Sequence, residues 1–138
     1  MQAEPPKAPE ATTFERCYPG TACYVRRVRA DLIQLAGCYP LGDEVVLLAS
    51  ELAANAIIHT RSREPDGKIT VRAQVRPGEY AWVEVVDQGG PWTACDHSDD
   101  RPHGLDIVAR LAGDGNWGID GDDACRVAWF RLNWPAEL

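Results

Sequence analysis

Three polar residues recur at every fourth position of an otherwise apolar stretch, and this spacing constrains the chain more than any other feature. Glu51, Asn55 and His59 lie within the run Ser50–Thr60. Helical residues four apart share one face, so Glu51 and Asn55 would project side by side, with His59 about one turn further on. A carboxylate and an amide on a largely buried helix cost free energy unless something pairs with them. The oxygens of Glu51 and Asn55 suit a ligand-bound Mg²⁺. The alternative is that the two side chains form a satisfied polar pair without a ligand. His59, taken alone, is typical of a helix end.

A second motif places an acid at the end of an apolar strand. The run Val85–Pro91 contains Asp87, followed closely by Gly89 and Gly90. Such an acid would lie at the mouth of a pocket, where glycines allow a flat ligand to approach closely. The carboxylate could accept a hydrogen bond from an exocyclic amine. The alternative is an ordinary strand-ending turn with a solvated aspartate.

A third motif opens a short apolar helix with a glycine. Gly104 follows His103, and Leu105 begins the apolar residues. Free backbone N–H groups and the positive end of the helix dipole would face an anion there. Arg101, just before, could add a bidentate phosphate contact. An ordinary helix start explains the same residues when the motif is taken alone.

The hydrophobic periodicity predicts three helices and five strands. Asp43 is the predicted N-cap of the second helix, and a connection of about fifteen residues, 88–102, is typical of a functional loop. This order favours an α+β fold, a two-layer sandwich of about three helices on a mostly antiparallel mixed sheet. Residues 1–11 are expected to form a flexible tail and 12–138 a single domain. The predicted helices span 22–36, 43–59 and 104–111, and the predicted strands span 13–18, 69–76, 80–87, 116–120 and 125–133.

Composition excludes several classes of function. The 138 residues carry 21 acidic and 14 basic side chains, a net charge of −7, which argues against direct nucleic-acid binding. No apolar stretch approaches the ~20 residues of a membrane span, and the N-terminus lacks the apolar core of a signal peptide. The five cysteines form no Cys-x-x-Cys pair, which indicates free thiols and a cytoplasmic protein.

The connecting loop raises one metal-binding alternative. Cysteine, histidine and aspartate side chains gather there, but their spacing matches no structural zinc pattern. A solvated acidic loop is the favoured interpretation. The residues concerned are Cys95, Asp96, His97, Asp99, Asp100 and His103.

Together, the three motifs and their order resemble the GHKL ATPase superfamily, and in particular the small RsbW-like anti-sigma-factor serine kinases. The run Ser50–Ala56 is similar to the N-box of that family, 85–89 to its first glycine box, and 103–108 to its second. The resemblance covers roughly 11–132. It implies the GHKL ATP-binding fold, ATP and Mg²⁺ as cofactors, and protein serine/threonine kinase activity.

The resemblance also implies roles for single residues. Asn55 would ligate the Mg²⁺ that bridges the ATP phosphates, and Glu51 would act as general base toward a partner serine. Asp87 would accept the adenine amino group, and Gly89 would make room for the ring. Gly104 and the backbone N–H groups after it would hold phosphate. The other residues expected to bind the nucleotide are Arg101, His103 and Leu105.

The partners implied by the resemblance are a sigma factor, an anti-anti-sigma protein of the STAS type, and a second copy of the chain in a homodimer. The sequence departs from the family pattern at three places: Pro102 replaces a glycine of the second box, Gly90 stands one place early, and 124–126 lacks the usual threonine. These departures favour an alternative, a regulatory binding module with a degenerate ATP site. A detached catalytic module of a histidine kinase is a third hypothesis, which the absence of a helix bearing a phospho-accepting histidine disfavours.

Overall fold

A computed structural model describes residues 11–37, 39–60, 62, 64–90, 103–122 and 124–134. These residues form three helices and five strands in the predicted order. The helices are α1 (Tyr24–Ala36), α2 (Gly42–His59) and α3 (His103–Ala112), and the strands are β1 (Thr12–Pro19), β2 (Lys68–Arg76), β3 (Tyr80–Asp87), β4 (Trp117–Gly121) and β5 (Arg126–Asn133).

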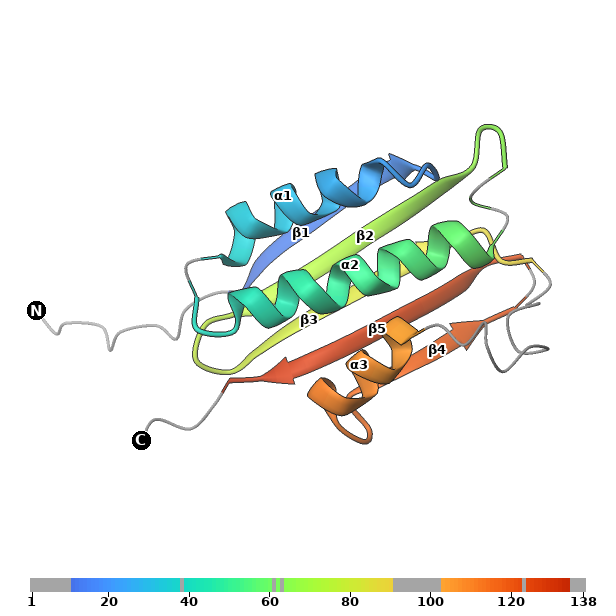
Figure 1. The fold of residues 1–138 in the computed structure, drawn as a ribbon. Coiled ribbons are helices and arrows are strands. Elements are labelled where there is room, and N and C mark those ends of the chain that lie inside the picture. Colours follow the sequence, from blue (N-terminus) through green and yellow to red (C-terminus); the bar gives the residue numbers. More distant parts are fainter. Residues whose placement is uncertain are drawn as a thin grey trace, which may run out of the picture.

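The five strands form one sheet in the order β1-β2-β3-β5-β4, and the helices cover one of its faces (Figure 1). The predicted α+β sandwich is therefore confirmed. One detail of the prediction is wrong, because all four pairings between the described strands are antiparallel and the sheet is not mixed. β3 meets β5 across a long connection that contains α3 and β4.

Alternation along the central strands separates the core from the open face of the sheet. In β3, Ala81, Val83 and Val85 are almost fully buried beneath the helices. Their neighbours Trp82 and Glu84 are half-buried on the opposite face, as the period of two predicts. Burial of this apolar face, rather than helix propensity, is the main source of stability for a two-layer fold.

Helix α2 lies across the middle of the sheet and packs against β3 (Figure 1). Its apolar side is deeply buried at Leu48, Leu52 and Ala53. Because Asn55 is one turn beyond Leu52 on a neighbouring side of the helix, this packing aims it toward the end of β3. The 3.6-residue periodicity thus brings the first two motifs of the sequence to one place.

The start of α2 differs from the prediction. Asp43 is not the N-cap: the helix begins at Gly42, the cap position is Leu41, and no side chain caps the helix. A Cβ atom at Gly42 would come within 2.2 Å of the Ala36 carbonyl oxygen, so only glycine lets the two helices meet so closely. Asp43 lies in the first turn instead, where it still complements the helix dipole.

Two observations bear on function classes. Within the described residues, no helix is long and apolar enough to cross a membrane. In the same part of the chain, no three acidic, histidine or cysteine side chains gather into a metal site, and Cys17, Cys23 and Cys125 are free thiols. The loop considered above as a metal site lies outside the described residues, except for the backbone of His103.

Candidate functional site

One small cavity joins the first two sequence motifs. Asn55 from α2, Asp87 from the end of β3 and Arg126 from the start of β5 all line it. Its volume of about 10 Å³ leaves room for roughly one water molecule. The rest of its wall is apolar. Those lining residues are Leu52, Ala56, Ile119 and Ala128.

The amide of Asn55 is unsatisfied. Its Nδ2 atom is buried and has no hydrogen-bond partner among the described residues. Leaving such a donor unpaired costs about 1–3 kcal/mol, and buried polar groups in folded proteins are seldom left so. The fold keeps this N–H donor unpaired at a cost, which a ligand with a hydrogen-bond acceptor at this place would remove.

Asp87 is the second polar group of the cavity, and its side chain is almost wholly enclosed. The residue is 4% exposed. Its Oδ1 atom accepts one hydrogen bond, from the backbone N–H of Gly89 at 2.7 Å. Burial raises the pKa of the Asp87 carboxyl above its usual value, and the Gly89 hydrogen bond and the charge of Arg126 oppose this shift. A carboxylate oxygen has more than one lone pair, so Asp87 retains acceptor capacity toward a ligand amine.

The turn after Asp87 depends on two glycines. Gly89 has φ +67° and Gly90 has φ +115°, a region that other residues rarely adopt. This backbone path directs the Gly89 N–H toward Asp87 and the Gly90 carbonyl toward Arg126, whose Nη2 donates to it at 3.1 Å. The glycines thus orient the acidic side chain, in addition to the predicted role of making room.

Arg126 is a residue of the cavity that the sequence did not reveal. The sequence showed only that the threonine usual in the family is missing near this position. The register of the sheet pairs Asp87 directly with Arg126, so the guanidinium lies beside the acid and the glycine turn. Only the pairing of β3 with β5 could have identified it, and that pairing joins segments far apart in the chain.

The remaining predicted residues lie apart from this cavity or beyond what the structure describes. Glu51 is half-buried one turn before Asn55 on α2 and does not line the cavity. His103, Gly104 and Leu105 form the first turn of α3, as the third motif predicted, and only their backbone is described. Arg101 lies outside the described residues.

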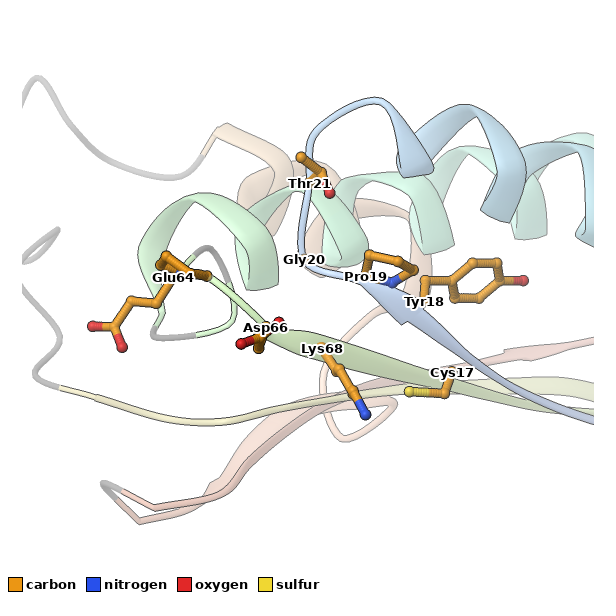
Figure 2. A pocket seen from close by; sticks show the side chains of 10 residues that line it. Cys17, Tyr18, Pro19, Gly20, Thr21, Glu64, Asp66 and Lys68 are labelled. Atoms are coloured by element: carbon orange, nitrogen blue, oxygen red, sulfur yellow. The ribbon is translucent and has the colours of Figure 1, made fainter.

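A larger cavity of about 630 Å³ lies elsewhere, where β1 ends and β2 begins (Figure 2). Exposed side chains such as Cys17, Glu64 and Lys68 line it, and none of the predicted site residues does. Size alone is a weaker indication of a site than a buried, unpaired amide beside a buried acid. We therefore place the candidate site at Asn55 and Asp87.

Comparison with known proteins identifies the family of the chain. Residues 19–120 match the model of a family described as the histidine kinase-like ATPase domain, and the chain belongs to that family. It is thus an ATPase domain of the kinase-like GHKL type, of which ATP binding is the family property.

Among solved structures, the chain is similar to the RsbU and RsbW domains of Rv1364c from Mycobacterium tuberculosis, with a TM-score of 0.67 and 20% sequence identity. The match covers 91% of this chain and 34% of that one, so the chain spans about a third of the length of its structural neighbour. At this identity the likeness supports the fold. The comparison with curated proteins found no match.

Proposed function

We propose that the protein is an ATP-binding anti-sigma factor and a serine kinase, which sequesters a sigma factor and phosphorylates a serine of a STAS-type anti-anti-sigma partner. The observation that carries the proposal is the cavity in which the unsatisfied Asn55 amide and the buried Asp87 carboxylate meet. Membership of the kinase-like ATPase family and the likeness in fold to a structure of RsbU and RsbW domains support it. A cytoplasmic location and a homodimer belong to the same proposal.

The residues of the cavity suit an adenine nucleotide. Asp87 would accept the exocyclic amine of the base, because one of its oxygens is committed to Gly89 and acceptor capacity remains. Asn55 would hold Mg²⁺ through its amide oxygen, a hard ligand of the kind this ion prefers. Held by Asn55, this ion would supply positive charge against the phosphates of the nucleotide. The start of α3, at His103 and Gly104, would offer backbone N–H groups to phosphate oxygens.

The chemical step would be an in-line transfer of the γ-phosphoryl group. The partner's serine oxygen would attack the γ-phosphorus as the bond to the leaving ADP oxygen breaks, and Glu51 would take the hydroxyl proton. Glu51 is half-buried and one helical turn from Asn55, so acid and metal ligand lie along one side of α2. Positioning and charge neutralisation would supply most of the rate enhancement.

A second candidate function is a regulatory binding module that no longer turns over ATP. The small volume of the cavity and the presence of Arg126 within it favour this alternative. Pro102 favours it as well, because proline removes one backbone N–H from the second glycine box. Both candidate functions use the same fold. They differ in whether the protein binds ATP and transfers its phosphoryl group.

Calorimetric titration with ATP, with and without Mg²⁺, separates the two. We expect Mg²⁺-dependent binding that Asn55→Ala weakens by about a hundredfold, a loss of the size expected for a charge-assisted contact. Asn133→Ala, at an exposed asparagine at the far end of β5, is the matched control and should bind as the wild type does. Absence of binding at millimolar ATP would contradict the kinase proposal.

Transfer to protein is tested next. Purified STAS-type partners are incubated with the protein and ATP, and phosphoserine is read by mass spectrometry. Glu51→Gln should bind ATP normally and lose phosphoryl transfer by two to four orders of magnitude, the usual worth of a general base. Binding without any transfer by the wild type would favour the regulatory module.

A further inference from the structure

Two buried hydroxyl groups organise the chain where it leaves α2. Ser62 is fully buried and Thr60 is 6% exposed. The Thr60 hydroxyl donates to the carbonyl of Ala56 and accepts the backbone N–H of Ser62 at 3.0 Å. The position of Ser62 relative to the helix is therefore fixed by side-chain hydrogen bonding.

Ser62 in turn holds the segment that follows Asp87. Its Oγ atom accepts the backbone N–H of Gln88 at 3.0 Å, and Gln88 is the residue between Asp87 and Gly89. The side chain of Gln88 makes a second anchor, because its Oε1 atom accepts the backbone N–H of Lys68 at 2.7 Å. Gln88 is thus fixed from the end of α2 and from the start of β2 at once.

Ser62 is also closely packed against Gly67. Gly67 lies so close to Ser62 that a Cβ atom on the glycine would be 1.9 Å from the Ser62 carbonyl oxygen. The Gly67 carbonyl also accepts the N–H of Gly20 at 2.8 Å, which ties this loop to the end of β1. In Figure 2 the loop residues Glu64 and Asp66, and Lys68 at the start of β2, line the larger cavity together with Pro19 and Gly20.

We propose that Ser62 is a positioning residue, which acts through Gln88 to hold the Asp87–Gly89 turn in place. The Asp87 carboxylate can then accept a hydrogen bond from the exocyclic amine of a purine. Ser62 thereby sets selectivity for adenine over a base that lacks the amine. The proposal rests on the proposed function of the cavity. Asp87 and Gly89 are joined by their own hydrogen bond, so a shift of Gln88 between them displaces both. Ser62 touches no ligand in this account and acts through the turn.

The test compares ATP with ITP, which carries an oxo group where adenine has its amine. Dissociation constants for both are measured by calorimetry for the wild type and Ser62→Ala. We expect Ser62→Ala to weaken ATP binding about tenfold, the worth of one hydrogen bond, and to leave ITP binding unchanged. The ratio of the two constants therefore moves toward one, which a general loss of structure would not cause.

Two variants serve as controls. Thr70→Ala removes a hydroxyl from the open face of β2 and should keep the wild-type ratio. Gln88→Ala, at an exposed side chain, removes the anchor to Lys68 and should shift the ratio in the same direction as Ser62→Ala, by a smaller factor. Because Gln88 is exposed, this variant keeps the test valid should Ser62→Ala fail to fold.

Each outcome decides. If Ser62→Ala weakens the binding of ATP and ITP equally, or of neither, the positioning role of Ser62 is overturned. The proposed function still stands in that case if the wild type binds ATP more tightly than ITP. A wild type that binds neither nucleotide overturns the proposed function and, with it, the inference. A ratio that falls in both Ser62→Ala and Gln88→Ala supports the role assigned to Ser62.

Discussion

Two aspartates, Asp31 and Asp87, are both largely removed from solvent and have very different surroundings. Asp31 of α1, whose side chain is 12% exposed, accepts a hydrogen bond from the Tyr18 hydroxyl at 2.6 Å and lies 3.1 Å from Arg16 Nη1 and 3.6 Å from Arg27 Nε. Asp87 has one backbone donor and the charge of Arg126 nearby. The first carboxylate is satisfied by the fold, and the second retains capacity for a ligand.

We propose that the difference separates a structural acid, Asp31, from a ligand-binding acid, Asp87. Asp31 joins the edge strand β1 to α1, because Tyr18 and Arg16 are on the strand and Asp31 is on the helix. The hydrogen bond of the Asp87 side chain stays within one turn, since its donor is Gly89, two residues on. Substitution of Asp31 should therefore alter stability, and substitution of Asp87 should alter binding.

The largest expected effect is on nucleotide affinity. Asp87→Asn should weaken ATP binding about a hundredfold, because a charged acceptor facing the amine is replaced by a neutral amide. Calorimetry measures the change. Asp31→Asn, an equal loss of charge at the satisfied site, should leave affinity within about twofold. Equal losses of ATP affinity in Asp87→Asn and Asp31→Asn would show that the two carboxylates do not differ in their role in binding.

A smaller effect is expected on stability at the other aspartate. Asp31→Ala should lower the free energy of unfolding by about 2 kcal/mol, because it leaves the Tyr18 hydroxyl without its acceptor and two arginines without their partner. Chemical denaturation gives the value. ATP affinity measured on the folded protein should be unchanged, and a hundredfold loss of affinity would show that Asp31 is coupled to the site.

The pH dependence of stability also depends on the burial of Asp87. Burial raises the pKa of Asp87 in the folded protein, so between the usual carboxyl range and this raised value the folded state binds more protons than the unfolded state. Stability therefore falls as pH increases through that window. Asp87→Asn should remove the fall and be more stable than the wild type at pH 7 without ligand. An Asp87→Asn variant less stable than the wild type at pH 7 would show that the ionised Asp87 carboxylate is not destabilising.

The smallest expected effect is at Tyr18. Burial, followed by the hydrogen bond to Asp31, raises the pKa of this phenol, so it remains a protonated donor at neutral pH. Tyr18→Phe should lower the free energy of unfolding by about 1 kcal/mol, the usual net worth of one hydrogen bond. Arg16→Ala, at the more exposed end of the same group, should change it by less than about 0.5 kcal/mol. Thermal unfolding of Tyr18→Phe and Arg16→Ala shows which substitution lowers the free energy of unfolding more.

Local pattern was sufficient to predict the elements and two of the polar residues of the site. The four-residue spacing at Glu51 and Asn55 requires only a helix, and the alternation that ends at Asp87 requires only a strand. The pattern also predicted a strand at 13–18 and a helix at 104–111, close to the observed bounds of β1 and α3. These features depend on residues close together in the chain, where periodicity is informative.

What the sequence could not predict depends on pairing between distant segments. Arg126 lies beside Asp87 because β5 is placed between β3 and β4 in the sheet and pairs with β3. Ser62 reaches Gln88 across 26 positions of sequence, from a segment that periodicity marks only as a loop. Asp31 accepts the hydrogen bond of Tyr18 because α1 packs against β1. The misplaced N-cap at Asp43 has a similar origin, since the close approach of α1 and α2 at Gly42 is a tertiary contact.

The register of β1 has a consequence for how the chain is made. β1 pairs along its whole length with β2, from Thr12 opposite Val75 to Pro19 opposite Lys68. About 50 residues separate the two strands, and a ribosome adds roughly 5–20 residues per second. The first strand therefore emerges and waits for several seconds without its neighbour. During that interval α1 and α2 are the available cover, and chaperone capture or premature association should be most sensitive to changes on the inner side of β1.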